Sequence, residues 1–348
     1  MKNYLIKISL STIVLLFLMM SFGALTTLRT VRKEIEDINS GISITNVLKT
    51  YFDDYEKWVP RGKTFNKLMY YSTGQINSEQ VILGKDDWLF YNLKSDGDPL
   101  GDYTGSKTYT ETDLKNILKS AEIIQNDIKN RSIEFCLLIA PNKENIYYRH
   151  MPERYPHIDV TRTDVLIRYL DENGIEVVDP KQELLKYSYQ YKTYYKNDTH
   201  WNQLGGYIGV RSVLEFFGYD VPGVNDDSIQ EGNEIFSDLL DVSKLHGVFK
   251  YDYGLNTKYS VNYREISRTD ERKLKVINNE NALYDKTVFI IGDSFSTAMQ
   301  SSISYFFKNV YVIWRDNYQS GMIDEINPDY VVLEFVERYS DRIAGFSL

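Results

Sequence analysis

The chain has 348 residues, of which 26% are charged, and its formal net charge is −9. This composition is typical of a globular, acidic protein and argues against a nucleic acid as its partner. The only cysteine, Cys136, excludes a disulfide within the chain and a metal site built from cysteines.

The chain begins with a long uncharged run. Residues 8–28 contain no charged side chain, and a helix of that length, at about 1.5 Å per residue, spans roughly the 30 Å of a bilayer core. Basic residues flank the run on both sides and do not decide its orientation. We expect residues 1–33 to be a cytoplasmic tip and a single transmembrane anchor, so that the remainder follows as one translocated domain. A cleaved signal peptide ending near Ser21-Phe22-Gly23 is the alternative.

The rest of the chain predicts a stalk followed by an α/β domain. Residues 34–80 are polar with an imperfect apolar stripe, which indicates a helical stalk. In 81–348, apolar runs alternate with helical patterns, and this alternation predicts a doubly wound, mostly parallel sheet in three layers. The predicted strands are a hairpin at 81–83 and 88–91, then 134–140, 175–178, 288–291, 310–314 and 330–336; the predicted helices are 112–130, 165–170, 181–187, 204–217 and 298–307.

One long segment breaks this alternation. Residues 221–285 are polar and carry no strong period. Segments of that length inside a domain are usually functional. We therefore expect an insertion over the site.

A candidate nucleophile follows one of the predicted strands. The apolar run Thr287–Ile291 is broken by Gly292 and Asp293, and a helical pattern follows Ser294. Ser294 therefore lies at the carboxyl end of a buried strand, where open α/β sheets place their sites and where helix amides can bind an oxyanion. The alternative is that Asp293 or Ser294 only caps the helix.

A candidate base and its orienting acid lie within one stretch of three residues. Asp198 and His200 are separated by one residue, so in an extended loop their side chains point the same way. A serine needs a base to take its proton, and the base needs a carboxylate to orient it. We expect Ser294 to be the nucleophile, His200 the general base and Asp198 the orienting acid. The alternative is a loop Asp that caps the helix near Asn202, with His200 packed on Trp201.

These motifs resemble those of the alginate O-acetyltransferase (AlgJ/AlgX-type) family of SGNH hydrolase-like proteins. The order Asp, His, then Ser is permuted relative to ordinary SGNH esterases, and this permutation is a feature of the family. Asp87 stands where the family usually has Gly. The matching stretches are Val81–Tyr91, Ala140-Pro141-Asn142-Lys143 with Tyr147, Asp198-Thr199-His200-Trp201-Asn202, Gly292-Asp293-Ser294-Phe295-Ser296, and Val332–Arg338.

The resemblance implies an SGNH-hydrolase-like fold and the same triad on Ser294, His200 and Asp198. It further implies a membrane-anchored, extracytoplasmic bacterial O-acetyltransferase that modifies a polysaccharide or cell-wall polymer. The acyl group would be delivered by a multi-pass membrane-bound O-acyltransferase partner. An esterase with the same triad and a non-catalytic glycan-binding or assembly protein are the alternatives.

The remaining site residues are less well defined by the sequence. The Ser294 amide is one expected oxyanion donor, and Asn142 and Arg315 are candidates for the others, the alternative being that both are surface-loop residues. Lys143, Glu337 and Arg338 are either structural or substrate-facing. We expect no cofactor and no metal, because the chain has neither a phosphate-binding glycine-rich loop nor a closely spaced pair of histidine ligands.

Overall fold

The computed structural model describes residues 63–348 with the exception of 77, 236, 250–251, 263–264 and 270–272. The predicted anchor at 8–28 and most of the predicted stalk lie outside the described residues. Within the described ranges, we find no helix that combines the length and the apolar character needed to cross a membrane. Helix α3 (Lys63–Thr73) precedes a compact unit, Thr73–Leu348, which contains all the elements below.

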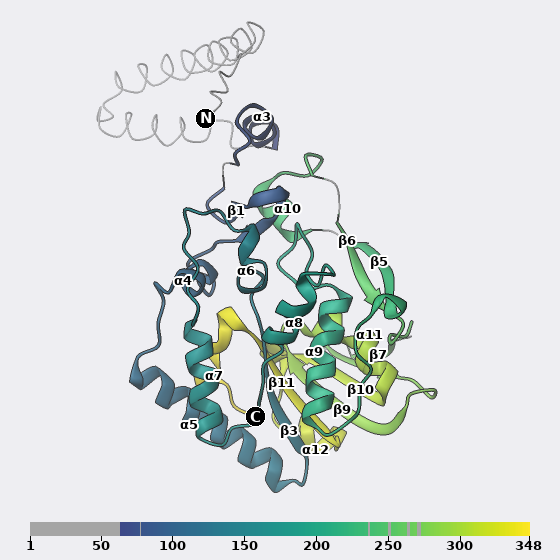
Figure 1. The fold of residues 1–348 in the computed structure, drawn as a ribbon. Helices are drawn as coiled ribbons and strands as arrows, with labels where there is room; N and C mark the ends of the chain where they lie inside the picture. The colour runs from purple at the N-terminus through teal and green to yellow at the C-terminus, as the bar shows by residue number, and fades with distance from the viewer. Residues whose placement is uncertain (1–62, 77, 236, 250–251, 263–264, 270–272) are drawn as a thin grey trace, which may run out of the picture. The chain divides into compact units, whose positions relative to one another are not determined.

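A seven-stranded sheet forms the centre of this unit (Figure 1). Its strand order is β4-β3-β11-β9-β10-β8-β7, and the first five strands run parallel. The five strands predicted for the sheet are confirmed. The strands are β3 (Glu134–Ala140), β4 (Val177–Val178), β7 (Glu265–Thr269), β8 (Leu274–Asn278), β9 (Tyr284–Gly292), β10 (Phe307–Trp314) and β11 (Tyr330–Val336).

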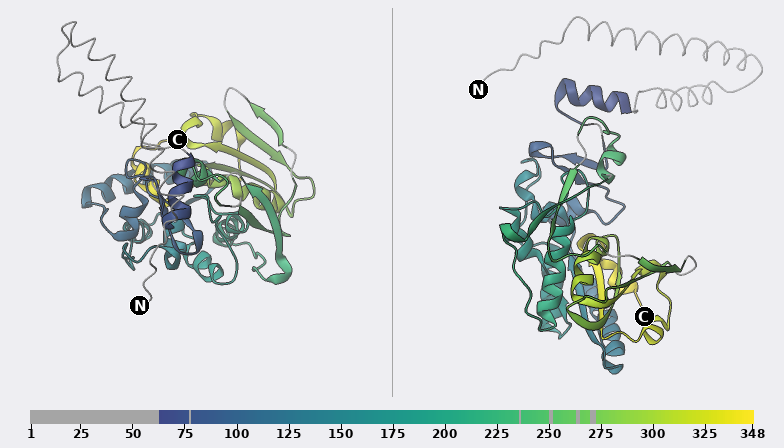
Figure 2. Two further views of the ribbon diagram at one scale, coloured as in Figure 1. Left: turned by 90° about the horizontal axis from the view of Figure 1, so that it is seen from above. Right: turned by 90° about the vertical axis from the view of Figure 1, so that its right-hand side faces the viewer.

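Helices cover both faces of the sheet, as predicted (Figures 1 and 2). Apolar side chains of α5 and α7 pack on one face, where Phe289 and Leu333 belong to the same buried cluster. Apolar side chains of α9 and α11 pack on the other face with Val288 and Val332. The main helices are α5 (Glu111–Asn130), α7 (Arg162–Glu172), α8 (Lys181–Ser188), α9 (Gln203–Phe216), α11 (Ser296–Phe306) and α12 (Met322–Ile326).

The predicted hairpin consists of β1 (Val81–Leu83) and β2 (Leu89–Tyr91), which pair antiparallel. Its turn holds Asp87 at φ 61, a left-handed conformation that glycine adopts at no steric cost. Trp88 stacks on Tyr147 with ring centroids 4.1 Å apart, and the Leu89 amide donates to the Lys196 carbonyl at 3.0 Å. The hairpin therefore supports the loop that carries Asp198 and His200.

The segment 221–285 is more regular than the sequence indicates. It contains a two-stranded sheet, β5 (Ile229–Ile235) with β6 (Asp252–Thr257), and the short helix α10 (Asp238–Ser243). Its later part extends the central sheet: β8 pairs antiparallel with β10, and β7 pairs antiparallel with β8. The prediction that 221–285 is an insertion over the site is therefore corrected for β7 and β8, which are strands of the central sheet.

Candidate active site

Ser294 occupies a tight turn between β9 and α11. A Cβ atom at Gly292 would lie only 2.6 Å from Oε2 of Glu334 and 3.1 Å from Cβ of Ser296, so a larger residue would crowd the turn where it passes β11. The Asp293 carboxylate accepts hydrogen bonds from the Phe295 amide at 3.0 Å and from the Val336 amide at 2.9 Å. The N-cap of α11 is Phe295, which has no side-chain capping bond, so neither Asp293 nor Ser294 is the N-cap. The Asp293 carboxylate instead ties the turn to the neighbouring strand.

His200 lies between Ser294 and Asp198. Its Nε2 is 2.6 Å from Oγ of Ser294, and its Nδ1 is 2.7 Å from Oδ1 of Asp198. The same Oδ1 accepts the His200 backbone amide at 2.9 Å. The structure therefore brings the three predicted residues together in one chain of hydrogen bonds, with the geometry that a serine nucleophile and its base require.

The charges around His200 suit a general base. Burial disfavours the imidazolium of His200, but the hydrogen bond and the charge of Asp198 outweigh burial and raise the pKa of His200. Burial also acts against the charged form of Asp198, yet its hydrogen bond with His200 and the His200 charge lower the pKa of Asp198 overall. Asp198 therefore remains ionised while His200 accepts a proton.

Lys143 holds the loop that carries these residues. Its side chain is 1% exposed, and Nζ donates to the carbonyls of Asp198 at 2.6 Å and of Tyr195 and Lys196 at 3.3 Å. Burial lowers the pKa of Lys143 to about 8, although the charge of Glu144 opposes that effect. Since the Lys143 ammonium donates its hydrogen bonds to backbone carbonyls, Lys143 is structural and does not face a substrate.

The pair Glu337 and Arg338 is also structural. The Glu337 carboxylate accepts the Asn142 amide at 2.8 Å and the Asn145 side-chain amide at 2.8 Å. The Arg338 guanidinium is buried and lies 5.5 Å from the centre of the Phe295 ring. Glu337 therefore joins the end of β11 to the segment after β3, and Arg338 packs beside the residue that follows Ser294.

Asn142 and Arg315 are not surface-loop residues. Asn142 is 1% exposed, and its Nδ2 is buried without a hydrogen-bond partner among the described residues. Arg315 donates to Oδ2 of Asp293 at 3.2 Å and to the Glu334 carbonyl at 2.6 Å. Arg315 thus orders the turn that precedes Ser294. An oxyanion role for either side chain stays a prediction.

A cavity of about 540 Å³ opens at Ser294 and His200. Its walls come from the loop before α9, from the start of α9, from β6 with the loop after it, and from the turn and helix at α11. They include neutral polar side chains that no sequence motif marks. The lining residues are Tyr195, Asp198, His200, Trp201, Gln203, Asn256, Val261, Asn262, Ser294, Thr297, Ala298 and Ser301.

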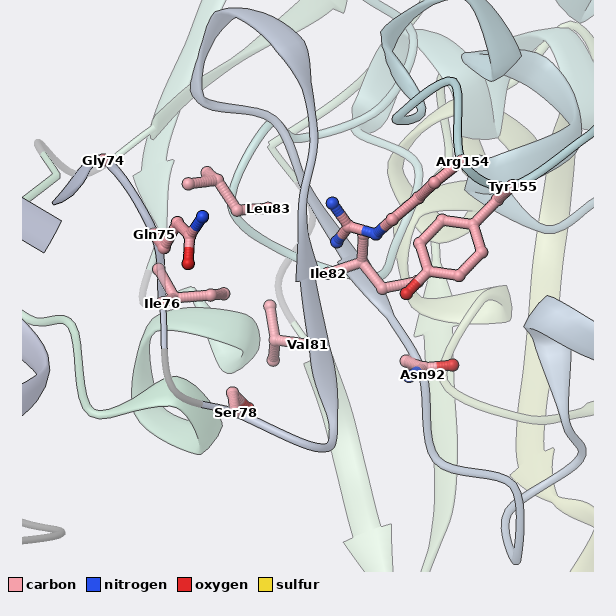
Figure 3. A pocket seen from close by; sticks show the side chains of 10 residues that line it. All are labelled: Gly74, Gln75, Ile76, Ser78, Val81, Ile82, Leu83, Asn92, Arg154 and Tyr155. Atoms are coloured by element: carbon pink, nitrogen blue, oxygen red, sulfur yellow. The ribbon is translucent and has the colours of Figure 1, made fainter. Parts of the chain in front are cut away.

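A second cavity, of about 270 Å³, lies beside the β1–β2 hairpin (Figure 3). Strand β1 lines it with Val81, Ile82 and Leu83, and Arg154 lies over the Tyr155 ring at 4.8 Å. Among the described residues, the two cavities have no lining residue in common. This second cavity is therefore separate from the candidate site.

A second carboxylate, that of Asp238, lies beside Asp198 and His200 and was not predicted from the sequence. Asp198, His200 and Asp238 offer ligand atoms within 4.8 Å of one another. However, both ring nitrogens of His200 lie within hydrogen-bonding distance of Ser294 and Asp198. A metal would have to displace one of those bonds, so the geometry fits acid–base chemistry better.

Comparison with known proteins identifies a family. Residues 81–310 match a family described as the SGNH hydrolase-like domain of the acetyltransferase AlgX. No curated protein sequence matches the chain.

Solved structures share the fold at low sequence identity. Bacillus cereus PatB1, solved with a sulfonyl adduct, superposes with a TM-score of 0.56 at 14% identity, over 79% of this chain and 99% of that one. A DHHW family protein from Eubacterium siraeum gives 0.56 at 13% identity, over 78% and 96%. The O-acetyltransferase domain of Pseudomonas putida AlgJ gives 0.47 at 16% identity, over 75% and 92%. The first two show that the α/β fold described above is a shared one.

Proposed function

Because the chain belongs to the family of SGNH hydrolase-like acetyltransferase domains typified by AlgX, we propose that it is an O-acetyltransferase that modifies a polysaccharide or cell-wall polymer. The observation that carries the proposal is the hydrogen-bonded chain from Ser294 through His200 to Asp198 at the mouth of the larger cavity. No cofactor is needed for this chemistry, since an ester donor supplies the acyl group.

The reaction has two halves. In the first, Oγ of Ser294 attacks the acyl carbon while Nε2 of His200 takes the hydroxyl proton; the ester bond then breaks, and the leaving oxygen receives that proton. In the second half, His200 takes the proton of a glycan hydroxyl, whose oxygen attacks the acyl-serine and releases Oγ. The proton returns to Ser294, and Asp198 stabilises the imidazolium in both halves.

The location and the partner form part of the proposal. An anchor at residues 8–28 would hold the catalytic domain on the outer side of the cell membrane, where its polymer is assembled. A multi-pass membrane-bound O-acyltransferase would then supply the acyl group to Ser294. Cell fractionation tests the anchor. We expect the full chain in the membrane fraction and a fragment of residues 34–348 in the soluble fraction.

Covalent labelling tests the nucleophile. An activated acetyl ester or a sulfonyl fluoride should modify Ser294, and mass spectrometry should place the group on the peptide containing Gly292–Ser296. Ser296 is the internal control, because it is 0% exposed and its Oγ donates to the Asp293 carbonyl at 2.7 Å. A label on Ser296, or no label at all, would favour the glycan-binding or assembly protein.

Transfer and hydrolysis differ only in the acceptor. With an acetyl ester donor and a glycan acceptor, we expect acetylated glycan to form faster than free acetate. The reverse ratio, with Ser294 still labelled, would identify an esterase that uses the same triad.

The pH dependence follows from the pKa of His200. The base must be neutral to accept the Ser294 proton, and Asp198 raises the pKa of His200. Activity should therefore be lost as pH falls through a midpoint above the ordinary histidine value of about 6.5. Measuring kcat/KM for a small acetyl ester against pH would show this limb, and a midpoint below that value would contradict the assignment.

A further inference from the structure

A second carboxylate lies beside the His200–Asp198 pair. Asp238 is the first residue of α10, and its backbone amide donates to Oδ2 of Asp198 at 3.0 Å. Its carboxylate accepts the Thr199 amide at 2.9 Å and the Thr199 hydroxyl at 2.5 Å. Its Oδ2 is 3.8 Å from Nδ1 of His200. Asp238 thus contacts all three residues from Asp198 to His200.

On the basis of the function proposed above, we propose that Asp238 is a positioning residue for the acyl-transfer reaction: it fixes the Asp198 carboxylate and places a second negative charge beside the imidazolium of His200. It contacts neither the serine nor the acyl group. It acts through Asp198 and through Thr199.

The two carboxylate oxygens of Asp198 accept hydrogen bonds from different residues. Oδ1 receives both donors of His200, the ring Nδ1 and the backbone amide. Oδ2 receives the Asp238 amide. A carboxylate held at both oxygens cannot rotate about its final bond, so the His200 ring is kept in the orientation that points Nε2 at Ser294.

Asp238 serves the loop and not its own helix. The cap of α10 is Ser237, which makes no side-chain capping bond, and both carboxylate oxygens of Asp238 are directed to Thr199 instead. An ordinary first-turn aspartate would bond to backbone amides of its own helix. The Asp238 side chain therefore stabilises the loop of Thr199 through bonds between elements.

The position of Asp238 is rigidly fixed. The next two residues, Leu239 and Leu240, are 0% exposed and pack with Val81 and Leu89 of the β1–β2 hairpin. That hairpin also holds the loop of His200, through the bond from the Leu89 amide to the Lys196 carbonyl at 3.0 Å. Helix α10 and the loop are therefore braced on a common support, as preorganised electrostatics requires.

The charges that face the pair come from several elements. Burial and the charge of Arg338 act to lower the pKa of His200. Asp198 and Asp238 act in the opposite direction and raise this pKa overall. Burial and the charge of Asp198 raise the pKa of Asp238 itself, while His200, the hydrogen bond from Thr199, and Lys143 oppose that rise. Removing the Asp238 charge should thus make the imidazolium less stable.

The test compares Asp238→Asn with Asp238→Ala in the full chain. The Asn variant keeps an acceptor for Thr199 and the backbone amide but loses the charge. We expect acylation of Ser294 by a small acetyl ester to be about 10-fold slower in Asp238→Asn, and slower still in Asp238→Ala. The acid limb of the pH profile should move to lower pH in both variants. Asp227→Asn, which removes an exposed carboxylate of the same segment, should change neither.

Three outcomes separate the possibilities. A slower reaction whose acid limb stays in place would show that Asp238 only supports the fold, and would overturn the proposal. In a His200→Ala background, Asp238→Asn should have no further effect, and an additive loss would equally overturn it. If Ser294 is never acylated in the protein without substitutions, the proposed function itself is wrong. Because the pH midpoint does not depend on the amount of folded protein, reduced folding cannot imitate the expected shift.

Discussion

Replacing His200 with Ala, or Ser294 with Ala, should lower kcat for acetyl transfer by about 10⁴-fold or more. The reason is the single chain of hydrogen bonds: Oγ of Ser294 is 2.6 Å from Nε2 of His200, which in turn is bound to Asp198 at 2.7 Å. Without His200 the hydroxyl keeps its proton, and without Ser294 no acyl intermediate forms. Asp198→Ala should cost less, because the carboxylate orients the base and does not itself react.

Single and double variants distinguish a catalytic unit from three independent side chains. The double variant His200→Ala/Ser294→Ala should be no slower than either single variant. Ser296→Ala is the matched control, since it removes a hydroxyl two residues away that only bonds the Asp293 carbonyl. Losses that add between His200 and Ser294 would show that the two residues do not act together.

The site could be predicted where its signals are local. The apolar run of β9 ends at Gly292, and Ser294 lies two residues before the first residue of α11. Strand, turn and helix patterns therefore placed the nucleophile at the carboxyl edge of the sheet from neighbouring residues alone. Asp198 and His200 are likewise close in sequence, and the structure only had to bring this pair to Ser294.

The partners that come from elsewhere could not be predicted. Asp238 belongs to a six-residue helix whose sequence has no distinguishing motif, and its contact with Thr199 exists only because α10 packs on the β1–β2 hairpin. Asn256 and Asn262 enter the cavity wall through β6 and the loop after it. Such contacts depend on tertiary packing, which local patterns do not record.

The polar composition of β7 and β8, at one side of the sheet, explains why the sequence did not predict these two strands. The sequence of β7, Glu265–Thr269, is largely polar, and β8 has one buried residue, Ile277. Outer strands of a sheet are often short and polar, since this discourages pairing with other chains. Neither strand has the apolar run of the central strands, so their addition beside β10 left no strong period in the sequence.

Replacing Gly206 with Ala should destabilise the protein and also impair catalysis, although the same change in an exposed helix interior would stabilise it by about 1 kcal/mol. Gly206 lies in α9, and a Cβ atom there would meet the carbonyl oxygen of Ala298 at 2.4 Å and its carbonyl carbon at 2.6 Å. These are backbone atoms of α11, which cannot rotate away, so the two helices must separate. Overpacking of this kind typically costs about 1–3 kcal/mol, which exceeds the gain in helix propensity.

The displacement should reach the nucleophile, because α11 begins two residues after Ser294, while α9 begins three residues after His200. Pushing these helices apart lengthens the distance between Oγ and Nε2, and a misplacement of about 1 Å can cost about 100-fold in rate. Thermal unfolding and kcat should be measured together, with Gly223→Ala as the control, since the only atom near its Cβ is the Tyr187 hydroxyl at 3.9 Å. A Gly206→Ala variant as stable and active as the unmodified protein would mean that the close approach of α9 and α11 does not position the pair.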